Sequence, residues 1–173
     1  CRTVEELIHL GGQQPEKYRQ VREEVCPRDN GLILYTSGTT GNSPKAVVSS
    51  YYNLVNGGIQ KAHAQALTEQ DVICCALQLF HIFCIDVNVL SALACGACLA
   101  MPDDLHTHSI LDAIQKSRCT VLSCVPCMYM AMMSRDDFAR FDLSSLRTGI
   151  IGGAYCPPDT FVSIENAFGL TLL

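Results

Sequence analysis

Short apolar runs rich in β-branched residues alternate with stretches of helical periodicity from Gly31 to the end of the chain. Such runs are typical of strands buried on both faces of a sheet, and their alternation with helices is typical of βαβ units. The expected strands span residues 32–36, 46–49, 72–77, 97–101, 120–125, 147–151 and 170–173, and the expected helices span 52–66, 82–94, 109–117, 126–133 and 158–168. The pattern predicts an α/β fold, with a layered, mostly parallel sheet and flanking helices.

The start and the end of the chain differ from this pattern. Residues 3–10 resemble one short amphipathic turn, and residues 13–30 are polar, charged and interrupted by Pro15 and Pro27, as surface segments are. We therefore predict a lead-in segment over residues 1–30 and a domain over residues 31–173. The chain ends on the apolar run GLTLL, where a natural domain rarely stops, so we expect residues 31–173 to be part of a larger domain.

Composition excludes several classes of protein. Apolar residues make up 49% of the 173 residues, which argues against disorder, and the net charge of −5 with no basic run argues against a nucleic-acid partner. No secretory signal is visible at the start. Residues 82–101 are the most membrane-like stretch, but they include Asp86 and Asn88. A buried helix followed by a strand explains them better, and we expect no membrane span.

The eleven cysteines lie mostly in apolar surroundings, as Cys74, Cys75, Cys95, Cys98, Cys119 and Cys124 do. Their odd number in a chain of this length indicates reduced core thiols and a cytoplasmic location. Two C-x-x-C pairs, Cys95/Cys98 and Cys124/Cys127, raise the alternative of a four-thiolate zinc site. The long gap between the pairs, their apolar neighbours and Pro126 favour buried structural cysteines, so no metal site is expected.

The most informative motif is LYTSGTTGNSPKAV, residues 34–47. An expected strand leads here into a loop of glycines and hydroxyl side chains that closes with Pro44 and Lys45. Glycine lets backbone N–H groups turn toward an anion, hydroxyls add donors, and the ammonium adds charge, so the loop indicates a phosphate site. A hydroxyl-rich surface turn is the alternative. The spacing matches neither the P-loop motif G-x-x-x-x-G-K-[ST] nor the dinucleotide motif G-x-G-x-x-G.

Four blocks together resemble the acyl-adenylate-forming superfamily, which comprises acyl- and aryl-CoA synthetases, luciferases and the adenylation domains of peptide synthetases. They occur in that family's order: YTSGTTGNSPKAV, LQLFHIFCID (residues 77–86), CTVLSCVP (residues 119–126) and DLSSLRTGIIGGAYCPP (residues 142–158). The resemblance covers the chain from about Asp29 to Leu173. It implies part of the large N-terminal domain of an adenylate-forming enzyme, without the C-terminal part and the lid.

The resemblance also implies a reaction and a set of site residues. A carboxylate oxygen would attack the α-phosphorus of ATP, pyrophosphate would leave with Mg²⁺ assisting, and the acyl adenylate would then react with the thiol of coenzyme A. Lys45 and His81 would be the catalytic residues. The residues implied in phosphate binding are Thr36, Ser37, Gly38, Thr39, Thr40 and Gly41, with Gly152, Gly153 and Ala154 on the adenine and acyl side.

Several points stay open at the level of sequence. Asn42 and Ser43 make the loop one residue longer than is usual in the family, so a non-catalytic nucleotide-binding relative is an alternative. An adenylation domain that loads a carrier protein is another. The sequence gives neither the acid nor the oligomeric state. His81 could also be a core imidazole, and His63, His106 and His108 are expected on the surface or in loops.

Overall fold

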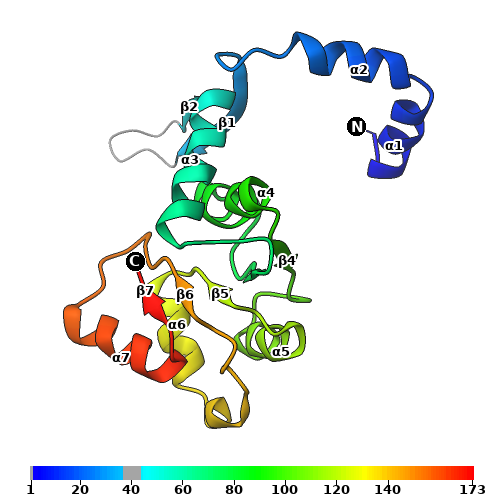
Figure 1. Cartoon of the computed structure of the whole chain (residues 1–173). Helices are drawn as coiled ribbons and strands as arrows, with labels where there is room; N and C mark the ends of the chain where they lie inside the picture. Colours follow the sequence, from blue (N-terminus) through cyan, green and yellow to red (C-terminus); the bar gives the residue numbers. More distant parts are fainter. Residues whose placement is uncertain (1, 37–43) are drawn as a thin grey trace. The chain divides into compact units, whose positions relative to one another are not determined.

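The computed structural model describes residues 2–36 and 44–173, and its contacts divide the chain into two compact units at the Tyr52/Asn53 boundary. We call residues 1–52 the N-terminal unit and residues 53–173 the sheet unit (Figure 1). The predicted division into residues 1–30 and 31–173 stays a prediction.

Two helices open the N-terminal unit. Helix α1, Val4–Gly12, begins at a capping box in which Thr3 and Glu6 exchange hydrogen bonds, as expected for the short amphipathic turn. Helix α2, Pro15–Glu24, was not expected, because Pro15 was interpreted as an interruption. Proline is instead well suited to the first turn of a helix, where its missing N–H leaves no hydrogen bond unmade.

Strands β1, Asn30–Thr36, and β2, Lys45–Ser50, form an antiparallel two-stranded ribbon. Both strands were predicted, but they pair with each other and not with the parallel sheet. Their last pair is Thr36 with Lys45. The two ends of the loop motif are therefore held opposite each other.

The sheet unit is built on five parallel strands in the order β4-β3-β5-β6-β7. The strands are β3 Val72–Cys74, β4 Cys98–Ala100, β5 Val121–Leu122, β6 Thr148–Gly149 and β7 Thr171–Leu172. The helices are α3 Tyr51–Ala64, the π-helix η1 Cys84–Leu90, α4 Ser91–Cys95, α5 Thr107–Ser117, α6 Pro126–Met133, the 3₁₀-helix η2 Phe138–Arg140 and α7 Pro158–Phe168. The predicted α/β class with a mostly parallel sheet is confirmed.

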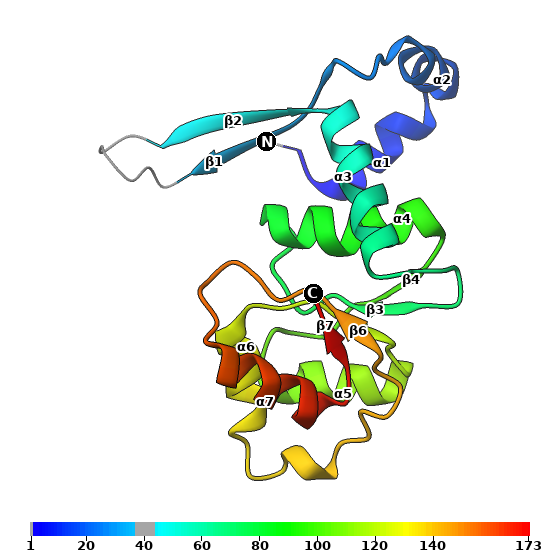
Figure 2. The same ribbon diagram turned by 60° about the vertical axis from the view of Figure 1, so that its left-hand side comes forward.

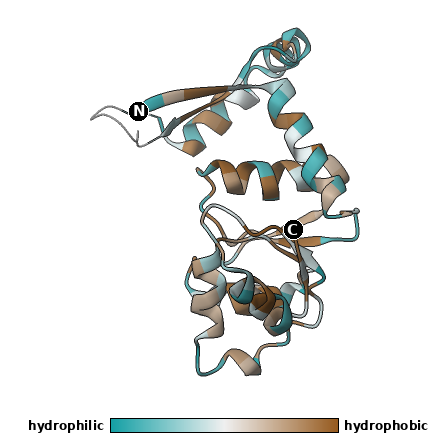
Figure 3. Ribbon diagram, turned by 90° about the vertical axis from the view of Figure 1, so that its left-hand side faces the viewer, coloured by the Kyte–Doolittle hydropathy of each residue, from teal (hydrophilic) through white to brown (hydrophobic). Residues whose placement is uncertain are grey.

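Helices cover the sheet on both faces (Figure 2). Alternate strand residues point to opposite faces, so Cys74 and Leu122 belong to the larger core with α5, α6 and α7. Ile73 and Val121 belong to a smaller core that includes Ala92 of α4. Figure 3 shows apolar residues concentrated along the sheet and in the helix over residues 84–95. The unit therefore has three layers.

Helix α3 lies very close to η1. A Cβ added at Gly58 would lie 2.7 Å from the backbone carbonyl of Leu90, so glycine is required at this crossing. One turn later, Lys61 pairs with Asp86 at 2.6 Å. No described helix has the length and apolar character needed to cross a bilayer. The membrane-like stretch at residues 82–101 is instead η1, α4 and β4, as expected.

An ion pair ties the amino ends of the strands together. The Asp71 carboxylate, 5% exposed, accepts from Arg147 Nε at 2.8 Å and Nη2 at 2.7 Å, and from the Thr120 hydroxyl at 2.6 Å. Asp71 directly precedes β3, Arg147 directly precedes β6, and Thr120 directly precedes β5. Arg147 also donates to the carbonyls of Gln65 and Ala66, just after α3. One buried carboxylate thus fixes three strands and a helix end.

We expect this ion pair to make stability depend on pH in acid. Burial alone would raise the pKa of Asp71, but hydrogen bonds from Arg147, Thr120 and Thr68 outweigh it and lower the pKa to about 2. Because the folded-state pKa is depressed, the stabilisation is present above the ordinary carboxyl pKa and disappears as pH falls toward 2. Asp71→Asn should lower the free energy of unfolding at pH 7 by on the order of 2 kcal/mol.

Urea unfolding at a series of pH values would measure this, with Asp112→Asn as control because Asp112 is only half-buried and pairs with the exposed Lys116. The difference between wild type and Asp71→Asn should shrink as the pH falls below about 4. A difference that is the same at pH 7 and pH 2 would contradict the assignment.

Candidate functional site

The predicted site residues of the sheet unit lie at the carboxyl edge of the sheet. Ligands of parallel α/β sheets bind where loops leave the carboxyl ends of the strands. The segment that follows β3 includes His81, the segment that follows β5 includes Val125, and the segment that follows β6 includes Gly152 and Gly153. Three separate stretches of sequence therefore reach the same edge.

His81 is exposed, so the alternative of a core imidazole is wrong. The backbone N–H of Phe83 donates to His81 Nδ1 at 3.1 Å. Because Nδ1 accepts, Nε2 holds the proton of the neutral ring. The His81 N–H itself donates to the Gln78 carbonyl, and its carbonyl accepts from Ile85. This turn leads into η1 and fixes the position of the imidazole.

The loop after β6 lies beside the His81 loop. A bridge between Cys124 and Ile151 extends the parallel pairing beyond the strands. Gly153 has φ +79°, and a Cβ added there would lie 3.2 Å from Val125 Cγ1. A Cβ added at Gly152 would meet Phe83 Cζ at 3.7 Å. The glycine loop therefore lies next to Phe83, in the segment that contains His81, and next to Val125, in the segment after β5.

A cavity of about 530 Å³ opens at this edge. Its walls are mostly apolar, with polar groups from the segments after β3 and before α5. The lining residues are Leu77, Gln78, His81, Phe83, Leu105, His106, Thr107, Val125, Met128 and Ala131. Apart from His81, no residue of this lining was selected from the sequence as a site residue, and His106 was expected simply on the surface or in a loop. The sequence pattern around the other lining residues did not indicate a cavity, because the lining comes from segments that are far apart in the sequence.

The phosphate-loop residues can be placed only in part. Thr36 and Lys45 are exposed and face each other across the end of the β1–β2 ribbon. The other predicted residues of the loop, Ser37, Gly38, Thr39, Thr40 and Gly41, lie outside the described residues. Ala154, the last predicted residue, is exposed just after Gly153.

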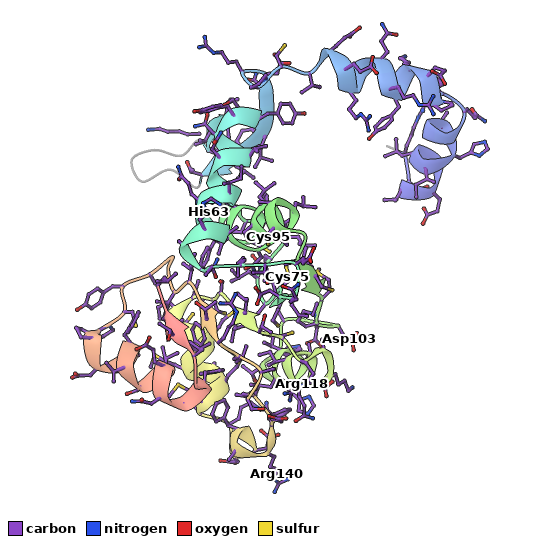
Figure 4. The ribbon with its side chains drawn as sticks, viewed as in Figure 1. His63, Cys75, Cys95, Asp103, Arg118 and Arg140 are labelled. Carbon is purple, nitrogen blue, oxygen red and sulfur yellow. The ribbon has the colours of Figure 1, made fainter. Side chains whose placement is uncertain are left out.

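The cysteines correct one expectation. Cys98 is exposed and Cys95 half-buried, so these two are not core thiols, whereas Cys74, Cys75, Cys119 and Cys124 are buried. Burial raises the pKa of Cys124 to about 12, which disfavours the thiolate that zinc needs. Over residues 2–36 and 44–173, no three His, Cys, Asp or Glu side chains converge as metal ligands would. Figure 4 labels Cys75, which follows β3, Cys95, which ends α4, and His63 on α3.

Comparisons with known proteins agree with this architecture. A family model described as AMP-binding enzyme matches residues 2–173. The chain is 37% identical over 150 residues to the putative acyl-CoA synthetase YngI of Bacillus subtilis (strain 168), covering 86% of this chain and 27% of that protein. The chain spans between a quarter and a third of the length of the curated relatives that it matches first.

Two solved structures show a similar arrangement of elements. The anthranilate CoA ligase AuaEII in complex with anthranoyl-AMP superposes with a TM-score of 0.77 at 25% identity, covering 84% of this chain and 29% of that chain. ATP-bound MatB from Rhodopseudomonas palustris superposes with a TM-score of 0.71 at 26% identity, covering 83% of this chain and 28% of that chain.

The two glycines of the loop after β6 make a matched pair for testing its geometry. Gly153→Ala should destabilise the loop by about 1–2 kcal/mol, because a left-handed backbone conformation is strained for alanine. Gly152→Ala should be tolerated, because its Cβ would make an ordinary contact with Phe83. Hydrogen exchange over residues 150–156 should accelerate in the first variant and not in the second. Equal exchange in both variants would show that the left-handed conformation is not required.

Proposed function

Because the chain belongs to the AMP-binding enzyme family, we propose that the whole protein uses ATP to convert a carboxylic acid into an acyl adenylate and then transfers the acyl group to coenzyme A. The observation that supports this most directly is the apolar cavity beside His81 and the glycine loop. The relatives named acyl-CoA synthetase or acyl-CoA ligase favour coenzyme A over a carrier protein as the acceptor.

The cavity is proposed to hold the acyl part of the acid. Its walls of Leu77, Val125 and Met128 would bury an apolar chain or ring, and burial of apolar surface would provide most of the affinity. Gln78 and His106 can contact polar groups of the substrate, and the Thr107 hydroxyl, which accepts from Arg135, can still donate to one. The carboxylate would then lie near His81, at the edge that the glycine loop also reaches.

His81 is proposed to hold and orient the reacting groups. Its Nε2–H can donate to an oxygen of the carboxylate or of the adenylate phosphate, because Nδ1 is occupied by the Phe83 N–H. Gly152, Gly153 and Ala154 are proposed to line the nucleotide side, where the absence of side chains on the two glycines allows a close backbone approach. Positioning the carboxylate oxygen at the α-phosphorus would provide much of the acceleration.

The β1–β2 ribbon is proposed to supply the phosphate contacts. Lys45 would neutralise charge on the pyrophosphate as it leaves, and the Thr36 hydroxyl would donate to a phosphate oxygen. Ser37, Gly38, Thr39, Thr40 and Gly41 would complete this cradle. The exposed, directly opposed positions of Thr36 and Lys45 support the proposal because both side chains are available to a ligand.

Two further expectations stay predictions. Mg²⁺ would enter with ATP, but the described residues provide no group of acidic side chains for it, and we assign no step to the metal. The cytoplasmic location expected from the cysteines is likewise untested.

The decisive experiment is ATP–pyrophosphate exchange in the whole protein that contains these residues. Lys45→Ala should reduce exchange on the order of a hundredfold, because the leaving pyrophosphate loses a cation. Calorimetry should show weaker ATP binding by the same variant. Lys116→Ala is the control, since Lys116 is an exposed partner of Asp112 in α5. Unchanged exchange and ATP affinity in Lys45→Ala would refute the proposed role.

A second experiment tests the acyl cavity. Met128→Trp should fill part of the cavity and raise the KM for the acid by about tenfold or more, while the affinity for ATP is unchanged. Met130→Trp is the matched control, because Met130 lies on the same helix, is 52% exposed and does not line the cavity. An equal effect of both substitutions would indicate damage to α6 instead of occupation of the cavity.

A further inference from the structure

Two buried cysteines meet at the base of the segment that contains His81. Cys75 follows β3 and Cys84 begins η1, and their sulfurs are 3.3 Å apart. Cys75 is 1% exposed and Cys84 0%. Residues 76–83 connect them and include His81 and three other residues of the cavity lining. Neither thiol has a part in the proposed adenylation chemistry.

The surroundings of this pair are unusually polar for a core. Asn88 lies one turn after Cys84, is fully buried, and its amide oxygen and nitrogen have no hydrogen-bond partner. A buried amide without a partner is costly, and such groups in native proteins often serve a chemical role. The amide is near both sulfurs, where it favours the thiolate form of each, although the net pKa of Cys84 is raised. Both Cys84 and Asn88 belong to a π-helical segment, a feature that frequently occurs at functional sites.

The hydrogen bond between the sulfurs makes the two thiols unequal. Donation from the Cys84 thiol lowers the pKa of Cys75 to about 7 against the opposing effect of burial, and it raises the pKa of Cys84. The backbone N–H of Leu77 also stabilises the Cys75 thiolate. These directions favour Cys75 as the thiol that reacts first, and the 3.3 Å between the two sulfurs places Cys84 to react with it next.

We propose that Cys75 and Cys84 form a reversible disulfide when hydrogen peroxide reacts with the protein. This bond would restrain residues 76–83, which we call the His81 segment. The Cys75 thiolate attacks one peroxide oxygen, the O–O bond breaks, and hydroxide leaves, giving a sulfenic acid. Hydroxide takes the proton of Cys84, whose sulfur attacks the Cys75 sulfur. The S–O bond breaks, and the departing oxygen becomes water by taking up the proton that Cys75 had released on forming its thiolate. Two thiols and one peroxide thus give one disulfide and two waters.

The Asn88 amide has a defined place in this sequence. Its N–H groups can donate to the sulfenic oxygen, which would otherwise lie unpaired in the core. Because both sulfurs are buried, a small reagent such as hydrogen peroxide should reach them more readily than a bulky disulfide does. Oxidised glutathione should therefore modify the exposed Cys26, Cys98 and Cys127 in preference to this pair.

The test is peptide mapping of the whole protein after treatment with hydrogen peroxide and alkylation of the remaining thiols. The chain has no Lys or Arg between Lys61 and Lys116, so trypsin would leave both cysteines in one peptide. Pepsin, which cuts near Leu79 and Phe80 in acid, would separate them unless a disulfide joins them. We expect a joined peptide that dithiothreitol separates. Over-oxidation of Cys75 with a free Cys84 thiol, or oxidation confined to the exposed Cys26, Cys98 and Cys127, would overturn the proposal.

Substitutions show which two cysteines form the disulfide, and a second measurement covers the case in which a variant does not fold. Cys75→Ala and Cys84→Ala should abolish the joined peptide, whereas Cys74→Ala, at the neighbouring buried thiol, should retain it. If either variant fails to fold, fragment spectra of the wild-type peptide distinguish Cys74 from Cys75. Asn88→Leu should slow disulfide formation severalfold. A link that survives Cys75→Ala would overturn the assignment.

The effect of the disulfide on activity rests on the proposed function, and it is measured separately from disulfide formation. Pyrophosphate exchange by wild type should fall severalfold on oxidation and recover with dithiothreitol, whereas Cys84→Ala should not respond in this reversible way. Disulfide formation without any change in exchange would overturn the restraint but leave the disulfide established. If the reduced protein shows no exchange at all, the proposed function fails, while hydrogen exchange over residues 76–83 still reports whether oxidation restrains the segment.

Discussion

The ion pair between Asp71 and Arg147 is the constraint on which the rest of the sheet unit depends. It lies at the amino edge of the sheet, and with Thr120 it connects the starts of β3, β5 and β6 to the end of α3. Parallel strands of two or three residues have few ladder hydrogen bonds of their own. Fixing their amino ends therefore determines where their carboxyl ends lie. Contacts at the amino edge of the sheet therefore help to set the positions of the loops at its carboxyl edge, which contain His81, Val125 and Gly153.

Much of the fold could be predicted from the sequence because its signals are local. Helices α6 and α7 were predicted with the bounds that the structure has, since Pro126 and Pro158 occupy first-turn positions. The parallel strands were predicted in the right places but too long. Their last apolar residues leave the ladder and enter loops, and hydrophobicity alone does not distinguish a buried loop from a strand. Helix α2 was missed because its signal is polar and begins with proline.

The site was predictable only where a family resemblance supplied it. His81, Gly152 and Gly153 were selected by motif, and the structure brings their loops together. The rest of the cavity, such as His106 and Met128, comes from segments whose patterns indicate only a loop and a helix. The sequence also could not predict that η1 is π-helical, because over seven residues the periodicity of a π-helix differs little from that of an α-helix. Cys84 and Asn88 therefore gave no sequence signal of their meeting with Cys75.

The pairing of Thr36 with Lys45 governs what variation the ribbon can accept. Side chains alternate between the two faces of a strand, so a slip of one residue in β2 would send the ammonium to the reverse face. Insertions within residues 37–44 leave that alternation intact. The lysine therefore keeps its face as long as the Thr36–Lys45 pairing is kept, whatever the number of residues between the two strands. The number of residues between β1 and β2 can therefore vary among related chains without a change in the pairing of the two strands.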